Sequence, residues 1–330
     1  MQMALDNYWY HKNAVAISLL PLSGLFRVIT GLRKLFYRIG LLKSVSLPVP
    51  VIIVGNINVG GTGKTPLVIH LSNLLYRQGY QPGVITRGYG GKQSTRPQLV
   101  TAGSDAYDVS DEAVLLATRC PCPVVISTDR VSSSQLLLNH GCNIIISDDG
   151  LQHYRLQRDI EIAVVDGERG FGNGYLMPAG PLRETTERLE SVDFIVTNGE
   201  SHRYSSTRSF LMRLKAHSFK SLHNTDEKNA SDFLGKEVHA IAAIGNPRRF
   251  FDLLRQLGLI IKEHSFTDHY RYSTSDIEFD DDLPVIMTEK DAVKCRQIVK
   301  AEKYWHLPIE ADLEDEFNQK LLNKLNDLDK

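Results

Sequence analysis

The sequence predicts an α/β protein: a mainly parallel sheet with helices on both faces, a second, smaller α/β domain and an N-terminal amphipathic helix. Short apolar runs alternate with helical patterns between residue 51 and about residue 200, which is typical of βα units in a parallel sheet. The alternation resumes near residue 238, and a basic amphipathic segment precedes both regions. A chain of 330 residues is long enough for two such domains.

Overall composition excludes several classes of protein. A formal net charge of −1 disfavours nucleic-acid binding. The four cysteines lack zinc-binding spacing and indicate free thiols in a reducing cytosol. No run of about 20 apolar residues occurs, so no membrane-spanning helix is expected. Nothing in the sequence indicates an obligate protein partner.

Residues 1–45 form the first predicted segment. Within residues 14–42, seven apolar residues fall at helical spacing: Leu25, Val28, Ile29, Leu32, Leu35, Phe36 and Ile39. Four cations lie largely off this stripe: Arg27, Arg33, Lys34 and Arg38. Such a helix suits the plane of a membrane interface, and Pro21 and Gly24 should break it before it could span. The alternative is a helix packed on the core with a solvated basic face.

Residues 46–200 form the predicted core domain. Its expected strands are Val51–Val54, Pro82–Thr86, Val124–Ser127, Ile144–Ser147, Ile160–Val165 and Phe194–Thr197. Helical patterns cover residues 64–78, 111–119, 129–140 and 185–190. Ligands of such sheets bind at the carboxyl ends of the strands, which is where the motifs below occur.

A glycine-rich loop joins the first strand to the first helix. It has the pattern of a phosphate-binding loop and consists of Asn58, Val59, Gly60, Gly61, Thr62, Gly63, Lys64 and Thr65. Lys64 would reach the β- and γ-phosphates of a nucleoside triphosphate, and the Thr65 hydroxyl would bind Mg²⁺. Asn58 replaces the usual first glycine, and asparagine tolerates the left-handed conformation better than most residues. The alternative is a glycine-rich turn without a ligand.

Carboxylates follow two further elements. The strand Ile144–Ser147 ends in Asp148 and Asp149, and an aspartate at such a strand end holds Mg²⁺ in phosphate-loop proteins. Asp111 and Glu112 begin a helix, where Asp111 could accept a hydroxyl proton and Glu112 could lie near the metal. The alternatives are a turn residue for the first pair and a helix cap for the second.

Three other motifs display charged side chains. Arg87 lies in a glycine-rich loop after a strand and could stabilise transferred charge or make a surface pair. Arg183 and Glu184 follow a proline-rich turn. Asp268 precedes His269, and an aspartate beside a histidine orients the imidazole in some sites, although most such pairs are structural.

Residues 201–230 are predicted to be a connecting ribbon or linker, and residues 231–330 the smaller C-terminal domain. The latter shows strands at Val238–Ala243, Ile260–His264 and Val285–Met287, with helices at 247–257 and from Asp291. Its tail from Glu310 is mostly acidic.

Two classes of nucleotide-binding protein are disfavoured. A guanine-reading Asn-Lys-x-Asp motif is absent, which argues against a GTPase. The loop is similar to that of dimeric membrane-positioning ATPases, but Val59 occupies the position of the extra lysine that their mechanism requires.

Taken together, the motifs resemble those of the tetraacyldisaccharide 4′-kinase family, the lipid A 4′-kinases of Gram-negative bacteria. The resemblance covers nearly the whole chain. It rests on VGNINVGGTGKTP (54–66), TRGYGG (86–91), SDEAVLLA (110–117), ISDDGLQH (146–153), GYLMPAGPLRE (174–184), AIGNPRRFF (243–251), FTDHY (266–270) and TEKDAVK (288–294). The asparagine at the first loop position is compatible with this family.

The resemblance implies an ATP- and Mg²⁺-dependent enzyme. Its substrate would be an acylated glucosamine disaccharide 1-phosphate, phosphorylated at the 4′-hydroxyl to give lipid IVA. It also implies an active site between two α/β domains and an N-terminal helix docked at the cytoplasmic face of the bacterial inner membrane, which would make the protein peripheral.

Site roles carried over by motif follow the same resemblance. Asp111 resembles the catalytic base and His269 its partner. Lys64 and Arg183 complete the predicted catalytic set, while Thr65, Glu112 and Asp148 are the predicted metal-linked residues. Arg87, Asp149 and Glu184 are expected in the substrate cleft, and no role follows for Asp268.

Two alternatives stay open on sequence grounds. One is a phosphate-loop kinase of a small soluble hydroxyl compound, with residues 1–45 packed on the core. The other is a membrane-associated ATPase that acts as a binding switch, although Val59 counts against it.

Overall fold

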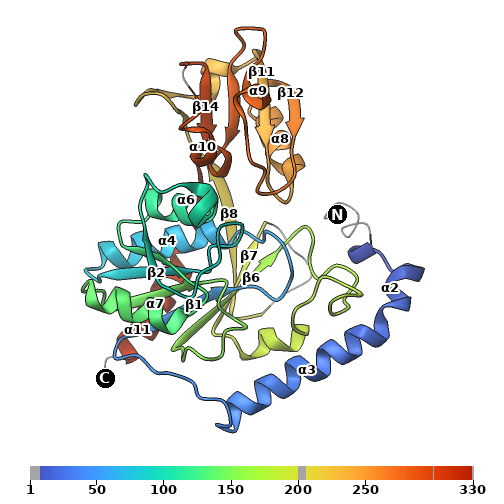
Figure 1. Ribbon diagram of the computed structural model, residues 1–330, viewed down its shortest axis with the longest axis vertical. Coiled ribbons are helices and arrows are strands. Elements are labelled where there is room, and N and C mark those ends of the chain that lie inside the picture. Colours follow the sequence, from blue (N-terminus) through green and yellow to red (C-terminus); the bar gives the residue numbers. More distant parts are fainter. Residues whose placement is uncertain (1–7, 200–205, 300, 329–330) are drawn as a thin grey trace.

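The computed structural model describes residues 8–199, 206–299 and 301–328. It contains a nine-stranded and a six-stranded sheet, and Figure 1 shows the smaller sheet above the larger one. The expected α/β fold with two sheets and flanking helices is confirmed.

The large sheet has the strand order β15-β8-β7-β6-β1-β5-β2-β4-β3. Neighbouring strands are parallel from β8 to β4, and the edge strands β15 and β3 are antiparallel. The strands are β1 (Val51–Gly55), β2 (Pro82–Thr86), β3 (Gln98–Val100), β4 (Val124–Ile126), β5 (Ile144–Asp148), β6 (Ile160–Asp166), β7 (Phe194–Asn198), β8 (Ser209–Ala216) and β15 (Ile309–Leu313).

Helices cover both faces of the large sheet, which explains why the sequences of its strands are continuous apolar runs. Ile52 and Val54 of β1 belong to the core cluster under α4, α6 and α11, whereas Val51 and Ile53 belong to the cluster under α7 and the 3₁₀ helix η1. These helices are α4 (Lys64–Arg77), α5 (Ala106–Val109), α6 (Asp111–Arg119), α7 (Arg130–Asn139), η1 (Thr186–Ser191) and α11 (Asp315–Leu328).

The small sheet has the order β10-β9-β14-β13-β11-β12 and is parallel from β14 to β12. Its strands are β9 (Phe219–Ser221), β10 (Glu227–Lys228), β11 (Glu237–Ala242), β12 (Ile260–Ser265), β13 (Val285–Thr288) and β14 (Tyr304–Leu307). Its helices are η2 (Ala230–Phe233), α8 (Pro247–Gln256), α9 (Thr274–Ile277) and α10 (Glu289–Cys295).

The end of the chain differs from the expected 231–330 domain, because β15 and α11 return to the large sheet. Strand β15 pairs antiparallel with β8, and α11 buries Phe317, Leu321 and Leu325 in the large core. These residues recur every four positions and form an apolar stripe within an acidic segment. The predicted domain 231–330, which was drawn from a second set of βα units, therefore assigned the tail to the wrong sheet.

The expected 201–230 linker also contains regular structure. Residues 209–216 form β8 of the large sheet, and β9 of the small sheet begins only three residues later. Positions 201–205 of the expected linker lie outside the described residues, as do the first seven positions of the expected N-terminal segment.

The N-terminal segment forms α2 (Ala14–Ser18) and α3 (Leu20–Arg38). The expected break at Pro21 and Gly24 is wrong in position, because the helices meet at Leu19 and α3 continues through both residues. Proline fits the first helical turn, where its missing N–H would have no helical partner. Within the described chain, no helix is both long and apolar enough to cross a membrane.

One face of α3 is held by the large domain. Ser23, the one buried residue of α3, donates a hydrogen bond to the Leu176 carbonyl (2.8 Å) and accepts one from the Ala179 amide (3.0 Å). The predicted apolar stripe is largely exposed on Leu25, Val28, Ile29, Leu32, Leu35 and Ile39. The stripe therefore faces away from the protein core.

Candidate active site

The phosphate-binding loop lies between β1 and α4. Gly63 caps α4 in the left-handed conformation, and a Cβ there would lie 2.5 Å from the Asn198 amide nitrogen. Glycine is therefore required for both conformation and space. The helix N-terminus and the loop amides form the usual cradle for a polyphosphate.

Asn58 has a different role from the one its sequence position indicated. It does not adopt the left-handed conformation. Instead, its buried side chain donates a hydrogen bond to the Gly170 carbonyl (2.7 Å), and the next amide, Val59 N–H, donates to the Pro181 carbonyl (2.8 Å). Asn58 thus attaches the start of the loop to segments that follow β6.

Asp149 follows β5 and lies between two cations. Its carboxylate accepts hydrogen bonds from Arg183 (3.0 and 2.9 Å to the two oxygens), and the Lys64 ammonium lies 3.6 Å away. Burial would raise the pKa of Asp149, but the charges of Lys64 and Arg183 outweigh it and hold the pKa well below its usual range. These three residues, expected separately, form one cluster beside the phosphate loop.

Asp148, the last residue of β5, fits a magnesium site. Its Oδ1 is buried and has no hydrogen-bond partner in the described part of the chain. Burial, followed by the negative charge of Glu112, raises the pKa of Asp148 to about 7, so a nearby cation would stabilise its ionised form. Thr65 lines the same cavity as Asp148 and Glu112.

Residues 8–199, 206–299 and 301–328 hold no cluster of three or more His, Cys, Asp or Glu side chains arranged for a metal. Mg²⁺ beside nucleotides is typically held by one or two carboxylates together with phosphate oxygens, so the residues present fit this ion. Glu112, the other predicted ligand, forms an ion pair with Lys290 in this structure.

Asp111 lies at the start of α6 and is only 3% exposed. Ser110 provides the helix cap by accepting a hydrogen bond from Ala113 N–H (3.2 Å), so the Asp111 carboxylate makes other contacts. Its Oδ1 lies 3.2 Å from His269 Nδ1, and its Oδ2 lies 3.6 Å from the Lys294 ammonium. The expected pairing of Asp111 with His269 is thus present as a contact.

The charges around this pair set its protonation. Burial would raise the pKa of Asp111, but the hydrogen bond from His269 and the charges of Lys290 and Lys294 lower it to about 2. The hydrogen bond with Asp111 raises the pKa of His269 against the effect of burial. The geometry therefore favours an imidazolium beside a carboxylate.

His269 is held by the loop that contains Arg87. A Cβ on Gly90 would lie 2.7 Å from His269 Nδ1, and the Tyr89 ring makes an edge contact with the imidazole at 5.5 Å between centroids. His269 itself has a positive φ of 58°. The glycine-rich loop of the large domain and the histidine of the small domain are thus fitted closely together.

The predicted residues surround one cavity of about 1600 Å³. Its walls include Val59, Gly60, Gly61, Thr62, Gly63, Lys64, Thr65, Arg87, Glu112, Asp148, Asp149, Arg183, Glu184 and His269. Two predicted residues are not part of the wall, Asn58 and Asp111, and the side chains of both are buried. The cavity extends to Phe26, Thr30 and Lys34 of α3.

Comparison with known proteins identifies the family. Residues 15–326 match the family model described as Tetraacyldisaccharide-1-P 4'-kinase. The chain belongs to this family. It is accordingly a kinase that transfers phosphate to a hydroxyl group.

The similarity to individual family members extends over full length. The kinase is 46% identical over 319 residues to tetraacyldisaccharide 4'-kinase of Nitrosococcus oceani, covering 96% of this chain and 93% of that protein. It is 47% identical over 327 residues to the enzyme of Methylobacillus flagellatus, covering 98% and 96%. Its fold is similar to LpxK from Aquifex aeolicus in complex with ATP, with a TM-score of 0.81 and 29% identity, covering 94% and 99%.

The sequence analysis did not predict the ion pairs of two further residues of the kinase. Lys290 and Lys294 lie one turn apart on α10 and pair with Glu112 and Asp111 of α6. The only available signal was the i, i+4 spacing of two lysines after a strand end. That spacing does not indicate which element of another domain they contact.

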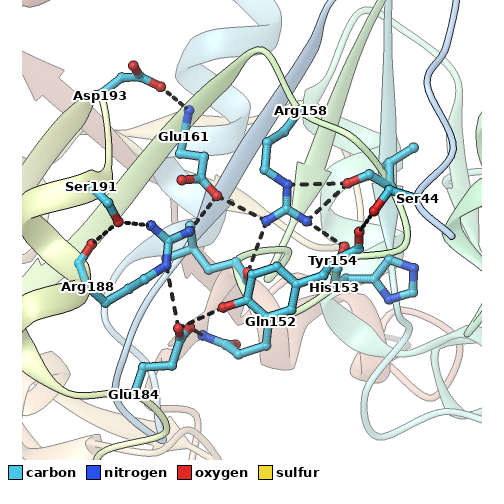
Figure 2. A network of polar contacts seen from close by, with 12 residues as sticks. Ser44, Gln152, His153, Tyr154, Arg158, Glu161, Glu184, Arg188, Ser191 and Asp193 are labelled. Atoms are coloured by element: carbon cyan, nitrogen blue, oxygen red, sulfur yellow. Dashed lines mark hydrogen bonds and ion pairs between the residues drawn. The ribbon is translucent and has the colours of Figure 1, made fainter. Parts of the chain in front are cut away.

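Glu184 is held by the polar network in Figure 2. Its carboxylate accepts hydrogen bonds from Gln152 Nε2 (2.8 Å) and the Tyr154 hydroxyl (2.8 Å), and Arg188 Nε lies 3.5 Å away. Arg188 also pairs with Glu161 of β6. The network fixes Glu184 to the sheet and connects two motifs that are about 30 residues apart.

Replacing Arg188 with methionine is expected to lower the free energy of unfolding by about 3 kcal/mol, because Glu161 and Glu184 would both lose this buried cation, although Glu161 keeps its ion pair with Arg158. The Arg188 side chain is 5% exposed and that of Glu161 12%. Denaturant unfolding measures the change. The matched control is Arg155→Met, because the Arg155 side chain is 50% exposed and its ion pair with Asp129 should contribute less than about 1 kcal/mol. Equal losses in the two variants would contradict the assignment.

Proposed function

We propose that this cavity binds ATP at the phosphate loop and an acylated glucosamine disaccharide 1-phosphate against α3, and transfers the γ-phosphate to the 4′-hydroxyl, forming lipid IVA. One observation carries the proposal. The same cavity is lined by the phosphate loop and by Phe26, Thr30 and Lys34 of a helix whose other face is apolar and exposed. A donor site for phosphate and a surface for a lipid substrate thus meet in one space.

On the donor side, the loop amides and Lys64 bind the β- and γ-phosphates. Lys64 is paired with Asp149 in this structure, and an incoming phosphate offers it a second anion. Thr65 and Asp148 would hold Mg²⁺, with Glu112 near them, and the ion would supply charge neutralisation at the transferred group. Arg183 orients Asp149 and presents a further cation to the cavity.

On the acceptor side, Asp111 receives the proton of the sugar hydroxyl and His269 positions it. Both residues lie where the two domains meet, and His269 already lines the cavity. Arg87 and Glu184 form other parts of the wall and contact the substrate. Phosphoryl transfer depends mainly on positioning and charge stabilisation, which these groups supply.

We also propose that α3 docks the enzyme at the cytoplasmic face of the inner membrane. The exposed stripe would enter the interface, and Arg38 would face anionic headgroups together with Arg27, Arg33 and Lys34, which also line the cavity. Replacing Leu25, Ile29 and Leu32 with glutamine is expected to weaken binding to anionic vesicles at least about tenfold, since three exposed apolar side chains are removed. Co-sedimentation with vesicles measures this.

The control for this membrane test carries glutamine at Tyr76 and Leu234, two exposed apolar residues outside α3. It should sediment like the wild type. Undiminished vesicle binding by the α3 variant, with an unchanged thermal midpoint, would show that α3 does not dock. Deleting the whole segment is a weaker test, because Ser23 and Trp9 form hydrogen bonds to the 176–179 loop.

Mass spectrometry tests the reaction itself. A tetraacyl disaccharide 1-phosphate incubated with the enzyme, ATP and Mg²⁺ should gain one phosphate at the 4′ position. ATP hydrolysis without this product would favour an ATPase switch. Phosphorylation of soluble hydroxyl compounds alone would favour a small-molecule kinase.

A further inference from the structure

Asn198 is a buried polar residue that the reaction described above does not use. It is the last residue of β7, which lies two strands from β1 at the carboxyl edge of the large sheet. Its side chain is 2% exposed and lines the cavity. The carboxyl edge is where nucleotides bind to such sheets, so its side chain lies at the edge of the sheet where the proposed ATP site is found.

The two ends of the Asn198 amide have different surroundings. The nitrogen donates a hydrogen bond to the Thr62 carbonyl in the phosphate loop (3.1 Å). The oxygen is buried and has no hydrogen-bond partner among residues 8–199, 206–299 and 301–328. The contact with a carbonyl fixes which end is which, because only the nitrogen can donate. A buried acceptor without a hydrogen-bond partner costs free energy, so we expect a donor of the ligand to bind to it.

The cavity wall around Asn198 is mixed, because Asp166 of β6, its neighbour in register, and Arg249 line the cavity together with aliphatic side chains. Asn198 pairs in register with Met212 of β8, and Leu214 lies two residues further along that strand. Leu214 lines the cavity, as do Leu307 at the end of β14 and Ile309 at the start of β15. The aliphatic side chains of this wall, together with the unpartnered acceptor of Asn198, match a flat aromatic base that carries a single amino donor.

We propose that Asn198 is the residue that selects adenine, with its Oδ1 accepting a hydrogen bond from the 6-amino group of the base. The inference rests on the proposed ATP site. Guanine carries a carbonyl oxygen at the same ring position, which would place two acceptors against each other. The bond from Asn198 to Thr62 couples this base site rigidly to the loop that holds the phosphates.

The test compares ATP with purine riboside 5′-triphosphate, which lacks only the 6-amino group. Both nucleotides displace a fluorescent ATP analogue from the full-length enzyme. The wild type is expected to prefer ATP by about fivefold to tenfold, as one hydrogen bond to a buried acceptor provides. In Asn198→Ala this preference should fall to about one, because the acceptor is gone.

Asn56→Ala is the matched control. Asn56 is also a buried asparagine that contacts the phosphate loop, through Gly60 and Thr62, and its Oδ1 also lacks a partner in the described chain. It does not line the cavity. Its loss should weaken both nucleotides equally and keep the wild-type ratio, which separates loop damage from base recognition.

An unchanged ratio in Asn198→Ala, or equal affinity of the wild type for both nucleotides, would overturn the inference. The wild-type comparison needs no variant, so it decides the question even if Asn198→Ala fails to fold. The mass-spectrometric assay on the same preparation separates the two proposals. Product formation with an unchanged ratio removes only the role of Asn198, whereas no ATP binding at all removes both.

Discussion

Replacing Asp111 with asparagine is expected to lower kcat by at least about a hundredfold while ATP still binds. A positioned general base typically contributes 10²–10⁴-fold, and asparagine keeps the shape of the side chain without accepting a proton. ATP affinity should change little, since Asp111 does not line the cavity. Single-turnover phosphorylation and nucleotide displacement measure the two effects separately.

Asp108→Asn is the control for this variant. Asp108 lies on the neighbouring helix α5, where its exposed carboxylate pairs with Lys92 at the surface. It should retain wild-type turnover. Near-normal phosphorylation by Asp111→Asn would remove Asp111 from the base role and leave the pair with His269 as a structural contact between domains.

The surroundings of Asp111 add a condition to this role. A carboxylate with a pKa near 2 is a weak base, and at 3% exposure Asp111 is covered in this arrangement of the two domains, so the small domain must move before a sugar hydroxyl can reach it. The cations that lower this pKa, His269, Lys290 and Lys294, all belong to the small domain. Movement of that domain therefore changes both the exposure and the basicity of Asp111.

Replacing Lys294 with methionine is expected to lower the free energy of unfolding by about 3–5 kcal/mol, the usual result of removing one partner from a buried charge pair. The Lys294 side chain is 2% exposed, 2.9 Å from Asp291 Oδ1 and 3.6 Å from Asp111 Oδ2. Its loss would leave two buried carboxylates without this compensating cation. Denaturant unfolding of the full chain measures the change.

Two controls accompany the Lys294 variant. Lys320→Met removes an exposed ion pair with Glu316 on α11 and should cost less than about 1 kcal/mol. A double-mutant cycle between Lys294→Met and Asp111→Asn should give a coupling above about 0.5 kcal/mol, because the two charges are neighbours. Additive effects in the cycle would show that Lys294 stabilises only its own helix.

The parts of the site that the sequence predicted are those encoded in contiguous segments. The phosphate loop and Asp149 follow apolar strands, and Asp148 is the last residue of one, so their residues and their position at the sheet edge could be inferred together. The cation pairs across the domains could not be inferred. Which helix Lys290 faces depends on how the two sheets pack, and no local pattern records that packing.

Two sequence arguments failed for physical reasons. The sequence argument explained Asn58 by its tolerance of the left-handed backbone conformation, which it does not adopt. Its side chain instead donates a hydrogen bond to the Gly170 carbonyl. Helix α11 was not predicted, because the acidic residues on its exposed face dominate the composition of the tail. Phe317 and Leu321 lie on its buried face. In both cases the decisive partner is more than 100 residues away along the chain.

Two short connections join the large sheet to the small one, and they affect how the two sheets can move. The chain passes from β8 to β9 through His217 and Ser218, and returns from β14 to β15 through Pro308 alone. These crossings lie side by side, since Ala216 pairs with Ile309, and Figure 1 shows β8 rising from the large sheet toward the small one. A paired ribbon bends easily about one axis but resists twisting and sliding. We therefore expect any motion of the small domain to hinge at this ribbon, which would move His269, Lys290 and Lys294 together relative to Asp111.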